Sequence, residues 1–181
     1  MTTNFEALAK KIVQRARRRG ADEAEIFIQV GRQADVRVRD GDIEDLTQAT
    51  SKGAGLRVFV KKRLGFAWTS DFSDQSVDLF VDRAIALAEA SAPNRQNGLP
   101  EAKGQLPIAD VGSLYDAEVA SLPPDWKINA SIEMEKIVRS FDSRIQAIDS
   151  VGAGESVSEI YLASSTGASH AYQCTSVYLY A

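Results

Sequence analysis

Histidine and cysteine are the side chains that most often hold a catalytic metal, and this chain has one of each, His170 and Cys174. A zinc peptidase site of the usual kind needs two histidines one helical turn apart, a third ligand and a general base, which a single histidine cannot supply. If their segment is a strand, His170 and Cys174 share one face but lie about 13 Å apart, too far to share an ion. We therefore predict no catalytic residue, no cofactor-binding residue and no metal ligand in this chain. The pair is interpreted as a strand histidine and a buried thiol.

Four further patterns could bind an ion or a phosphate, and each has a simpler structural interpretation. Asp40-Gly41-Asp42 begins like a calcium loop but lacks the downstream glutamate at the required spacing, and a hairpin turn explains it. Gly53-Ala54-Gly55 and Gly152-Ala153-Gly154 precede no helix, so they indicate bulges or a close backbone approach rather than phosphate binding. The arginines between Arg15 and Arg19 lie at the carboxyl end of a predicted helix, where they complement its dipole.

Composition places the chain among ordinary globular proteins, because 44% of its 181 residues are hydrophobic and 25% are charged. A net charge of -4 and a pI of about 5.1 argue against a nucleic-acid-binding domain. No apolar run approaches the roughly 20 residues of a membrane span, and the segment from Met1 to Arg19 is amphipathic rather than a secretory signal. A single cysteine excludes an internal disulfide and suits a reducing compartment. We expect a cytoplasmic protein without nucleic-acid or membrane partners.

Two successive β-hairpins are predicted between Ala34 and Thr69. In the first, Val36 and Val38 alternate with arginines, and Asp40-Gly41 favours a type I′ turn that sets Arg37 opposite Glu44. In the second, a three-residue Lys61-Lys62-Arg63 loop would place six apolar side chains on one face of the sheet. These are Leu56, Val58, Val60, Leu64, Phe66 and Trp68.

Helical spacing predicts three helices around these strands. The first begins near Phe5 and stops at Gly20, and a strand over Ala24 to Val30 follows it. Ser73 can cap the second helix and Asp125 the third. The expected buried stripe of the second helix is Val77, Phe80, Val81, Ala84, Ile85 and Ala88, and that of the third is Ala130, Met134, Ile137, Val138 and Phe141. Two strand-like runs, about Arg144 to Ser164 and Ala168 to Ala181, close the chain around a Thr166-Gly167 turn.

The predicted fold class is α/β of the α+β type, with a mixed, mainly antiparallel curved sheet and helices packed on one face. We divide the sequence into a core of residues 1–92, a wrapping connector of residues 93–124, and a helix plus strand hairpin over residues 125–181. All five prolines lie between Pro93 and Pro124, which favours an extended connector. Its apolar residues suggest that it wraps across a surface: Leu99, Leu106, Ile108, Val111, Leu114 and Tyr115.

Three segments together resemble the amino-terminal domain of the TldD/PmbA family. They are Gly20-Ala21-Asp22-Glu23-Ala24-Glu25 after the first helix, VRVRDGDIEDL from Val36, and GAGLRVFVKKRLGFAWTSD from Gly53. The family is described as metallopeptidase-related and is often labelled modulator of DNA gyrase. The segments from Ser91 to Asp116 and from Ala130 to Arg144 are more similar to the PmbA branch, also called TldE, than to the TldD branch.

The resemblance implies a role in cytoplasmic proteolysis. In the family, the metal motif His-Glu-x-x-x-His with a later Cys belongs to the TldD-type subunit, and no residue of this chain matches it. Zinc or another divalent metal is therefore expected only in a TldD-type partner or in a domain that follows this segment. The implied partners are a TldD-type subunit in a heterodimer, or a second copy in a homodimer, and an unfolded peptide. The implied processes are degradation of unfolded peptides and maturation of a peptide precursor.

Two functions of different class are compatible with these observations. The first is a scaffold or substrate-guiding domain of a peptidase subunit, and the alternative is a non-catalytic interaction module of the gyrase-modulator type. The chain ends within an apolar strand, Ser176 to Ala181, which favours an amino-terminal piece of a longer protein, with a natural short paralogue as the alternative. We expect the strand around Cys174 to Tyr180 to pair with structure outside this chain or with another copy.

Overall fold

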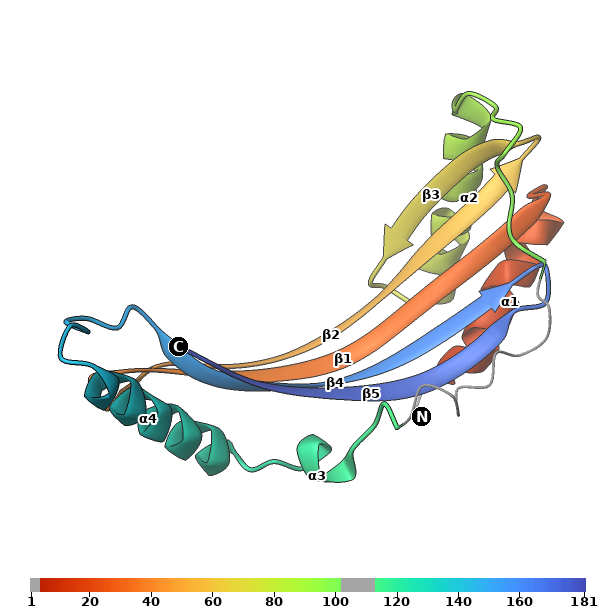
Figure 1. Cartoon of the computed structure of the whole chain (residues 1–181). Coiled ribbons are helices and arrows are strands. Elements are labelled where there is room, and N and C mark those ends of the chain that lie inside the picture. Colours follow the sequence, from red (N-terminus) through yellow and green to blue (C-terminus); the bar gives the residue numbers. More distant parts are fainter. Residues whose placement is uncertain (1–3, 102–112) are drawn as a thin grey trace. The chain divides into compact units, whose positions relative to one another are not determined.

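The computed structural model describes residues 4–101 and 113–181 and contains one five-stranded sheet in the order β3-β2-β1-β4-β5 (Figure 1). The strands are β1 (Glu23–Arg39), β2 (Asp42–Val60), β3 (Arg63–Thr69), β4 (Val151–Ser164) and β5 (Ser169–Tyr180). The predicted α+β class and the mainly antiparallel sheet are confirmed. The helices are α1 (Phe5–Arg18), α2 (Asp74–Ala90), α3 (Ala117–Ala120) and α4 (Pro124–Phe141).

The chain forms two compact units, each built from three separate segments. Unit 1 comprises the described residues of Met1–Val30, Lys52–Asp110 and Glu159–Tyr172. Unit 2 comprises those of Gly31–Ser51, Val111–Ser158 and Gln173–Ala181. Strands β1, β2, β4 and β5 thus contribute residues to both units. The three-part division of the sequence at residues 92 and 124 stays a prediction.

Unit 1 holds the larger core, which α1 and α2 form with one face of the strands (Figure 1). Asn4 caps α1 and Ser73 caps α2, each by accepting a backbone N–H with its side chain. The six residues of the predicted stripe of α2 are the buried ones, so that prediction is confirmed. The arginines near the end of α1 do more than complement its dipole, because Arg15 and Arg19 both pair with Asp78 of α2, at 2.8 and 2.6 Å.

The β2–β3 hairpin has a different register from the predicted one. Val60 pairs with Arg63, so the loop contains two residues, Lys61 and Lys62, both with positive φ. This one-residue change turns Leu64, Phe66 and Trp68 away from the face of Leu56, Val58 and Val60. Gly65 and Ala67 take their place beneath α2. The physical reason is space: a Cβ added at Gly65 would lie 2.6 Å from the backbone nitrogen of Ala88.

The β1–β2 hairpin follows the prediction at its turn and exceeds it in length. Asp40 and Gly41 both have positive φ, as a type I′ turn requires, and Arg37 pairs with Glu44 at 2.8 Å. The two strands predicted over Ala24–Val30 and from Ala34 are one strand, β1. Likewise, β2 is continuous from Asp42 to Val60. The residues between the predicted strands continue the extended backbone without a turn.

In unit 2, α4 packs on the sheet with a face that the sequence did not predict. Its N-cap is Pro123 rather than Asp125, which lies in the first turn. Its buried residues, Lys127, Ser131 and Glu135, follow one another at intervals of four residues. Of the predicted stripe, Ile137 and Phe141 are exposed, at 57% and 81%, whereas Ala130, Met134 and Val138 are only partly buried. The apolar core of this unit is small: Val36, Val38 and Val151, with Ile128, Ile132, Met134 and Ile148 packed against it.

The connector contacts both units where it is described. In unit 1, the Asn94 N–H donates to the carbonyl of Lys62. In unit 2, the Leu114 carbonyl accepts from the Thr175 N–H at 2.9 Å. Leu106, Ile108 and Val111 lie outside the described residues. The predicted strand run from Arg144 begins at Val151, and Gly167 in the following turn has positive φ.

Candidate functional site

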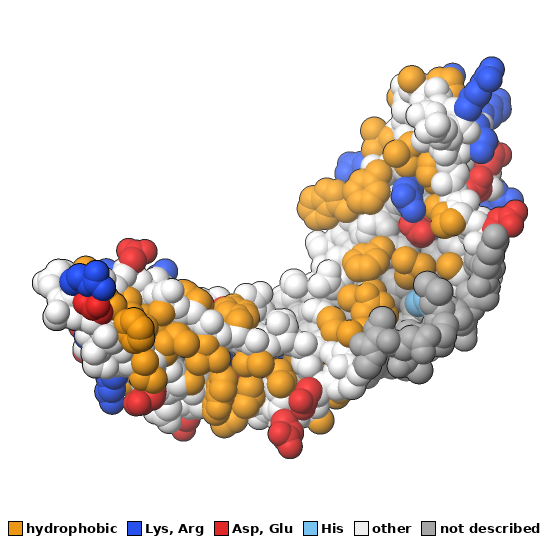
Figure 2. Space-filling model, viewed as in Figure 1, with side chains coloured by type: hydrophobic (Ala, Val, Ile, Leu, Met, Phe, Trp, Pro, Cys, Tyr) orange, Lys and Arg blue, Asp and Glu red, His pale blue; other side chains and the backbone are white. Residues whose placement is uncertain are grey.

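Unit 1 presents exposed apolar side chains on the sheet face opposite α1 and α2. On β3 it presents Leu64, Phe66 and Trp68, which are 40%, 55% and 72% exposed, and β1 adds Phe27 at 40%. We call these four residues the open face. Figure 2 shows hydrophobic side chains gathered where Figure 1 places β3 and its neighbours. Several exposed, mainly aromatic side chains on one sheet face are typical of binding rather than of a solvated sheet.

The open face is shaped by a missing side chain and bordered by an ion pair. A Cβ added at Gly55 would lie 3.1 Å from ring carbons of Phe66, so the glycine leaves room for this ring to lie across β2. Arg57, which pairs with Phe66 across the hairpin, also forms an ion pair with Glu25 of β1 at 2.7 Å. The face therefore offers aromatic contact with a polar border. It has no nucleophile with an adjacent base.

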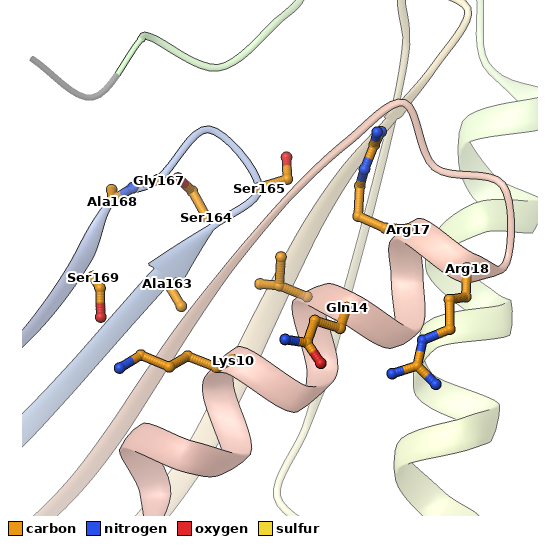
Figure 3. Close-up of a pocket in the computed structure, with 11 residues that line it drawn as sticks. Lys10, Gln14, Arg17, Arg18, Ala163, Ser164, Ser165, Gly167, Ala168 and Ser169 are labelled. Atoms are coloured by element: carbon orange, nitrogen blue, oxygen red, sulfur yellow. Dashed lines mark hydrogen bonds between the residues drawn. The ribbon is translucent and has the colours of Figure 1, made fainter.

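A basic pocket of about 500 Å³ lies between α1 and the β4–β5 turn (Figure 3). Its cations are Lys10, Arg17 and Arg18, of which Lys10 pairs with Glu6 at 2.7 Å and Arg17 donates to the Ala21 carbonyl. Its hydroxyl groups stabilise the turn: that of Ser165 accepts from the Ala24 N–H and that of Ser164 from the Ala168 N–H. The pocket can attract an anion, but it does not assemble a catalytic set.

Unit 2 contains a buried ion pair between α4 and β4. Lys127 Nζ lies 2.8 Å from Glu155 Oε2, and the two side chains are 3% and 5% exposed. The Ser131 hydroxyl donates to the Lys127 carbonyl at 2.7 Å and completes the polar contact on this face of the helix. The pair borders a cavity of about 120 Å³ with Arg32 and Asp35 of β1. Buried charges that pair with each other fix a helix on a sheet without needing a ligand.

Glu135 attaches α4 to the tip of the β1–β2 hairpin. Its carboxylate oxygens accept the backbone N–H groups of Asp40 and Gly41, each at 2.8 Å. Burial alone raises the pKa of Glu135, but the hydrogen bonds from Arg139 and from the Gly41 and Asp40 backbones outweigh it and hold the pKa below its usual value. The turn interpreted in sequence as a structural hairpin is therefore held by a buried carboxylate.

The residues weighed in sequence as candidate metal ligands are not brought into a site. His170 and Cys174 both lie in β5, and no group of three metal-ligating side chains occurs among residues 4–101 and 113–181. The donors in this part of the chain thus do not fit a transition metal. No described helix is long and apolar enough to cross a membrane. Three of the four paired glycines, Gly55, Gly152 and Gly154, mark close approach, since a Cβ at Gly152 would lie 2.7 Å from the Tyr180 hydroxyl oxygen.

Sequence reasoning missed the buried polar residues Lys127, Ser131, Glu135 and Glu155. The i, i+4, i+8 spacing of the three on α4 is a helical stripe, but a polar one, and polar stripes usually face solvent. It also assigned Phe66 and Trp68 to the core rather than to the surface. The sequence does contain a signal for their orientation. Gly65 and Ala67 alternate with the aromatic residues, and small side chains are the ones that fit beneath a closely packed helix.

Comparison with known proteins identifies the family. Residues 24–88 match the model of PmbA/TldA metallopeptidase domain 1, and residues 117–181 match that of the PmbA/TldA metallopeptidase central domain. A curated relative, the metalloprotease PmbA homolog of Haemophilus influenzae, is 27% identical over 160 residues. The match covers 83% of this chain but 35% of that protein, so the chain spans about a third of its curated relative.

Solved structures agree with the sequence matches. A proposed modulator of DNA gyrase from Bacteroides thetaiotaomicron superposes with a TM-score of 0.81 at 26% identity, covering 99% of this chain and 41% of that one. TldE from Thermococcus kodakarensis superposes with a TM-score of 0.76 at 19% identity, covering 95% and 38%. The latter identity supports the fold alone. The two family models and the PmbA relative show that this chain belongs to the PmbA/TldD family.

Proposed function

We propose that this chain is the scaffold and substrate-guiding part of a PmbA/TldD-type peptidase subunit, and that it holds an unfolded peptide without cleaving it. The observation that carries the proposal is the open face, whose aromatic side chains lie on the side of the sheet opposite the helices. Unfolded peptides expose apolar side chains, and such side chains gain by leaving water against an aromatic surface.

The partner and the metal are proposals that rest on family membership. We propose that the catalytic metal is carried by a TldD-type partner subunit or by parts of the protein outside this chain. Cleavage would then occur in the cytoplasm, at a site that the open face supplies with substrate. Support within the chain is the donor set of the described residues, which forms no metal-binding group.

The test is a cleavage assay on the full-length protein co-purified with a TldD-type subunit, with an unfolded peptide as substrate. Trp68→Ser and Phe66→Ser should each lower kcat/KM about fivefold or more, mainly by raising KM, because each removes a large contact for the substrate. Phe141→Ser is the matched control, since Phe141 is 81% exposed on α4 and lies outside the open face. It should leave kcat/KM unchanged.

The alternative, an interaction module without a role in proteolysis, predicts another outcome. In that case the complex would cleave the peptide equally well with and without the two serine substitutions. Equal kcat/KM values in folded variants would therefore refute the substrate-guiding role.

A further inference from the structure

The register of β3 determines which of its backbone groups point outward from the sheet. Val60 and Arg63 close a two-residue loop, so they exchange both backbone hydrogen bonds, and such pairs alternate with non-bonded pairs along an antiparallel ladder. Arg63, Gly65 and Ala67 therefore direct their N–H and C=O groups toward β2. Leu64, Phe66 and Trp68 direct theirs away from it, because β3 is an edge strand.

The first described residues of the connector contact the beginning of this outer edge. Pro93 forms an isolated antiparallel bridge with Arg63, and the Asn94 N–H donates to the Lys62 carbonyl at 2.9 Å. Farther along the strand, no backbone group in residues 4–101 or 113–181 bonds to the outward groups of Phe66 or Trp68. Within the described part of the chain, the edge is thus covered at one end and uncovered over Phe66 to Trp68.

The two residues with open backbone groups, Phe66 and Trp68, are also the two aromatic residues of β3, and their side chains are exposed. Both side chains lie on the open face, so a strand placed beside them would find hydrogen bonds and apolar contact together. Natural proteins usually protect an edge with charge, proline or a bulge, but β3 itself carries none of these between Leu64 and Thr69.

We propose that the outer edge of β3, from Phe66 to Trp68, binds an extended apolar peptide segment as an added strand antiparallel to β3. The inference rests on the proposed function for the identity of its occupant, an unfolded peptide. The added residues directly opposite Phe66 and Trp68 would exchange backbone hydrogen bonds with them and place their own side chains on the open face.

Charge sets the direction of the added strand. Lys61 and Lys62 precede β3, and Asp71 follows it. The hydroxyl of Ser76, the Ser73 backbone N–H and the Ser73 hydroxyl lower the pKa of Asp71, so its carboxylate is charged at neutral pH. An antiparallel peptide with free termini brings its carboxylate toward the lysines and its amino group toward Asp71. The connector, which already runs antiparallel at Arg63, has the same direction.

The first experiment measures binding of a fluorescent heptapeptide of alternating valine and threonine to the 181-residue chain, by anisotropy. Methylating the valine amide nitrogens should weaken binding about tenfold or more, because these nitrogens would donate to β3. Methylating the threonine amide nitrogens should change the Kd less than about twofold, since they would face away. Equal effects of the two methylations would overturn the proposal, and the open face could still bind peptide by side-chain contact alone.

The second experiment changes the protein. Phe66→Pro and Phe66→Ala both remove the ring, but proline also removes the outward N–H without breaking a bond to β2. The proline variant should bind the peptide about fivefold more weakly than the alanine variant, provided that the two melt at the same temperature. If proline unfolds the chain, the methylated peptides still decide the question.

Two further outcomes are informative. A spin label at the peptide amino terminus should broaden the amide signals of Ser70 and Asp71 rather than those of Lys61 and Lys62, and the reverse would exclude the antiparallel direction. The chain could instead form a dimer in which β3 of one copy pairs with β3 of the other. If excess peptide does not dissociate such a dimer, the edge serves a second copy of the chain. That result would overturn the proposal, whereas the cleavage assay tests the substrate-guiding role separately.

Discussion

Gly65 is the position at which one methyl group should do most damage to unit 1. A Cβ there would lie 2.6 Å from the Ala88 nitrogen and 2.9 Å from the Ala88 Cβ, and it would also overlap the carbonyl oxygen of Ala84. These are atoms of α2, two of them backbone, so rotating a side chain cannot relieve the overlap. For Gly65→Ala, α2 must move off β3, and α2 carries much of the core.

The expected cost follows from this geometry. Overpacking a close contact costs about 1–3 kcal/mol, and the backbone contact places Gly65→Ala at the upper end, about 3 kcal/mol. For a chain of this length that corresponds to a fall in Tm of roughly 6–12 °C. The matched control is Gly53→Ala on β2, where the nearest atom to an added Cβ is the Thr69 carbonyl oxygen at 3.7 Å, an ordinary contact. The control should change stability by less than about 0.5 kcal/mol, or raise it slightly by restricting the unfolded chain.

The assay is urea unfolding followed by circular dichroism, with Tm as a second measure. A Gly65→Ala chain as stable as wild type would refute the reasoning, because the packing of α2 on β3 would then have to be looser than the contacts indicate. If Gly65→Ala and Gly53→Ala lost equal free energy of unfolding, the cause would be a general effect of replacing glycine in the sheet, and not the close approach of α2 to Gly65.

Three further predictions concern buried or hydrogen-bonded charges. Glu155→Leu should destabilise the chain by about 3–5 kcal/mol, because it leaves Lys127 buried without its partner, whereas combining it with Lys127→Met should return most of that stability in urea unfolding. The folded-state pKa of Glu135 is depressed, so its stabilising effect is complete above the unfolded value of 4.5 and is lost as pH falls through the lower folded pKa. Unfolding midpoints between pH 3 and 7 should therefore fall less with acidity in Glu135→Gln than in wild type, and equal slopes would contradict this. The hydrogen bond to Glu159 raises the pKa of Tyr161 to about 12, so Glu159→Gln should bring the ionisation of Tyr161 back toward 10.0 in an ultraviolet absorbance titration.

The sequence determined those features whose causes lie within a few residues. Ser73 accepts a hydrogen bond from the chain three residues on, so it starts α2, and the spacing of its apolar residues gives the buried stripe. Asp40 and Gly41 tolerate positive φ, so they form the turn that pairs Arg37 with Glu44. The lack of a metal motif in the sequence needed no structure, because a single histidine cannot form a pair.

The candidate site depended on contacts that the sequence does not specify locally. The Lys61-Lys62 loop could hold two or three residues by local preference, and tertiary contacts, above all the closeness of α2 to Gly65, select the two-residue register. That choice moved Phe66 and Trp68 from the core to the open face.

The same holds for the buried face of α4. Periodicity favoured its apolar residues, but Lys127 and Glu135 find their partners in Glu155 and in the turn at Asp40, far away in the chain. A polar side chain can be buried only where its partner already is, and the tertiary structure alone brings the two together.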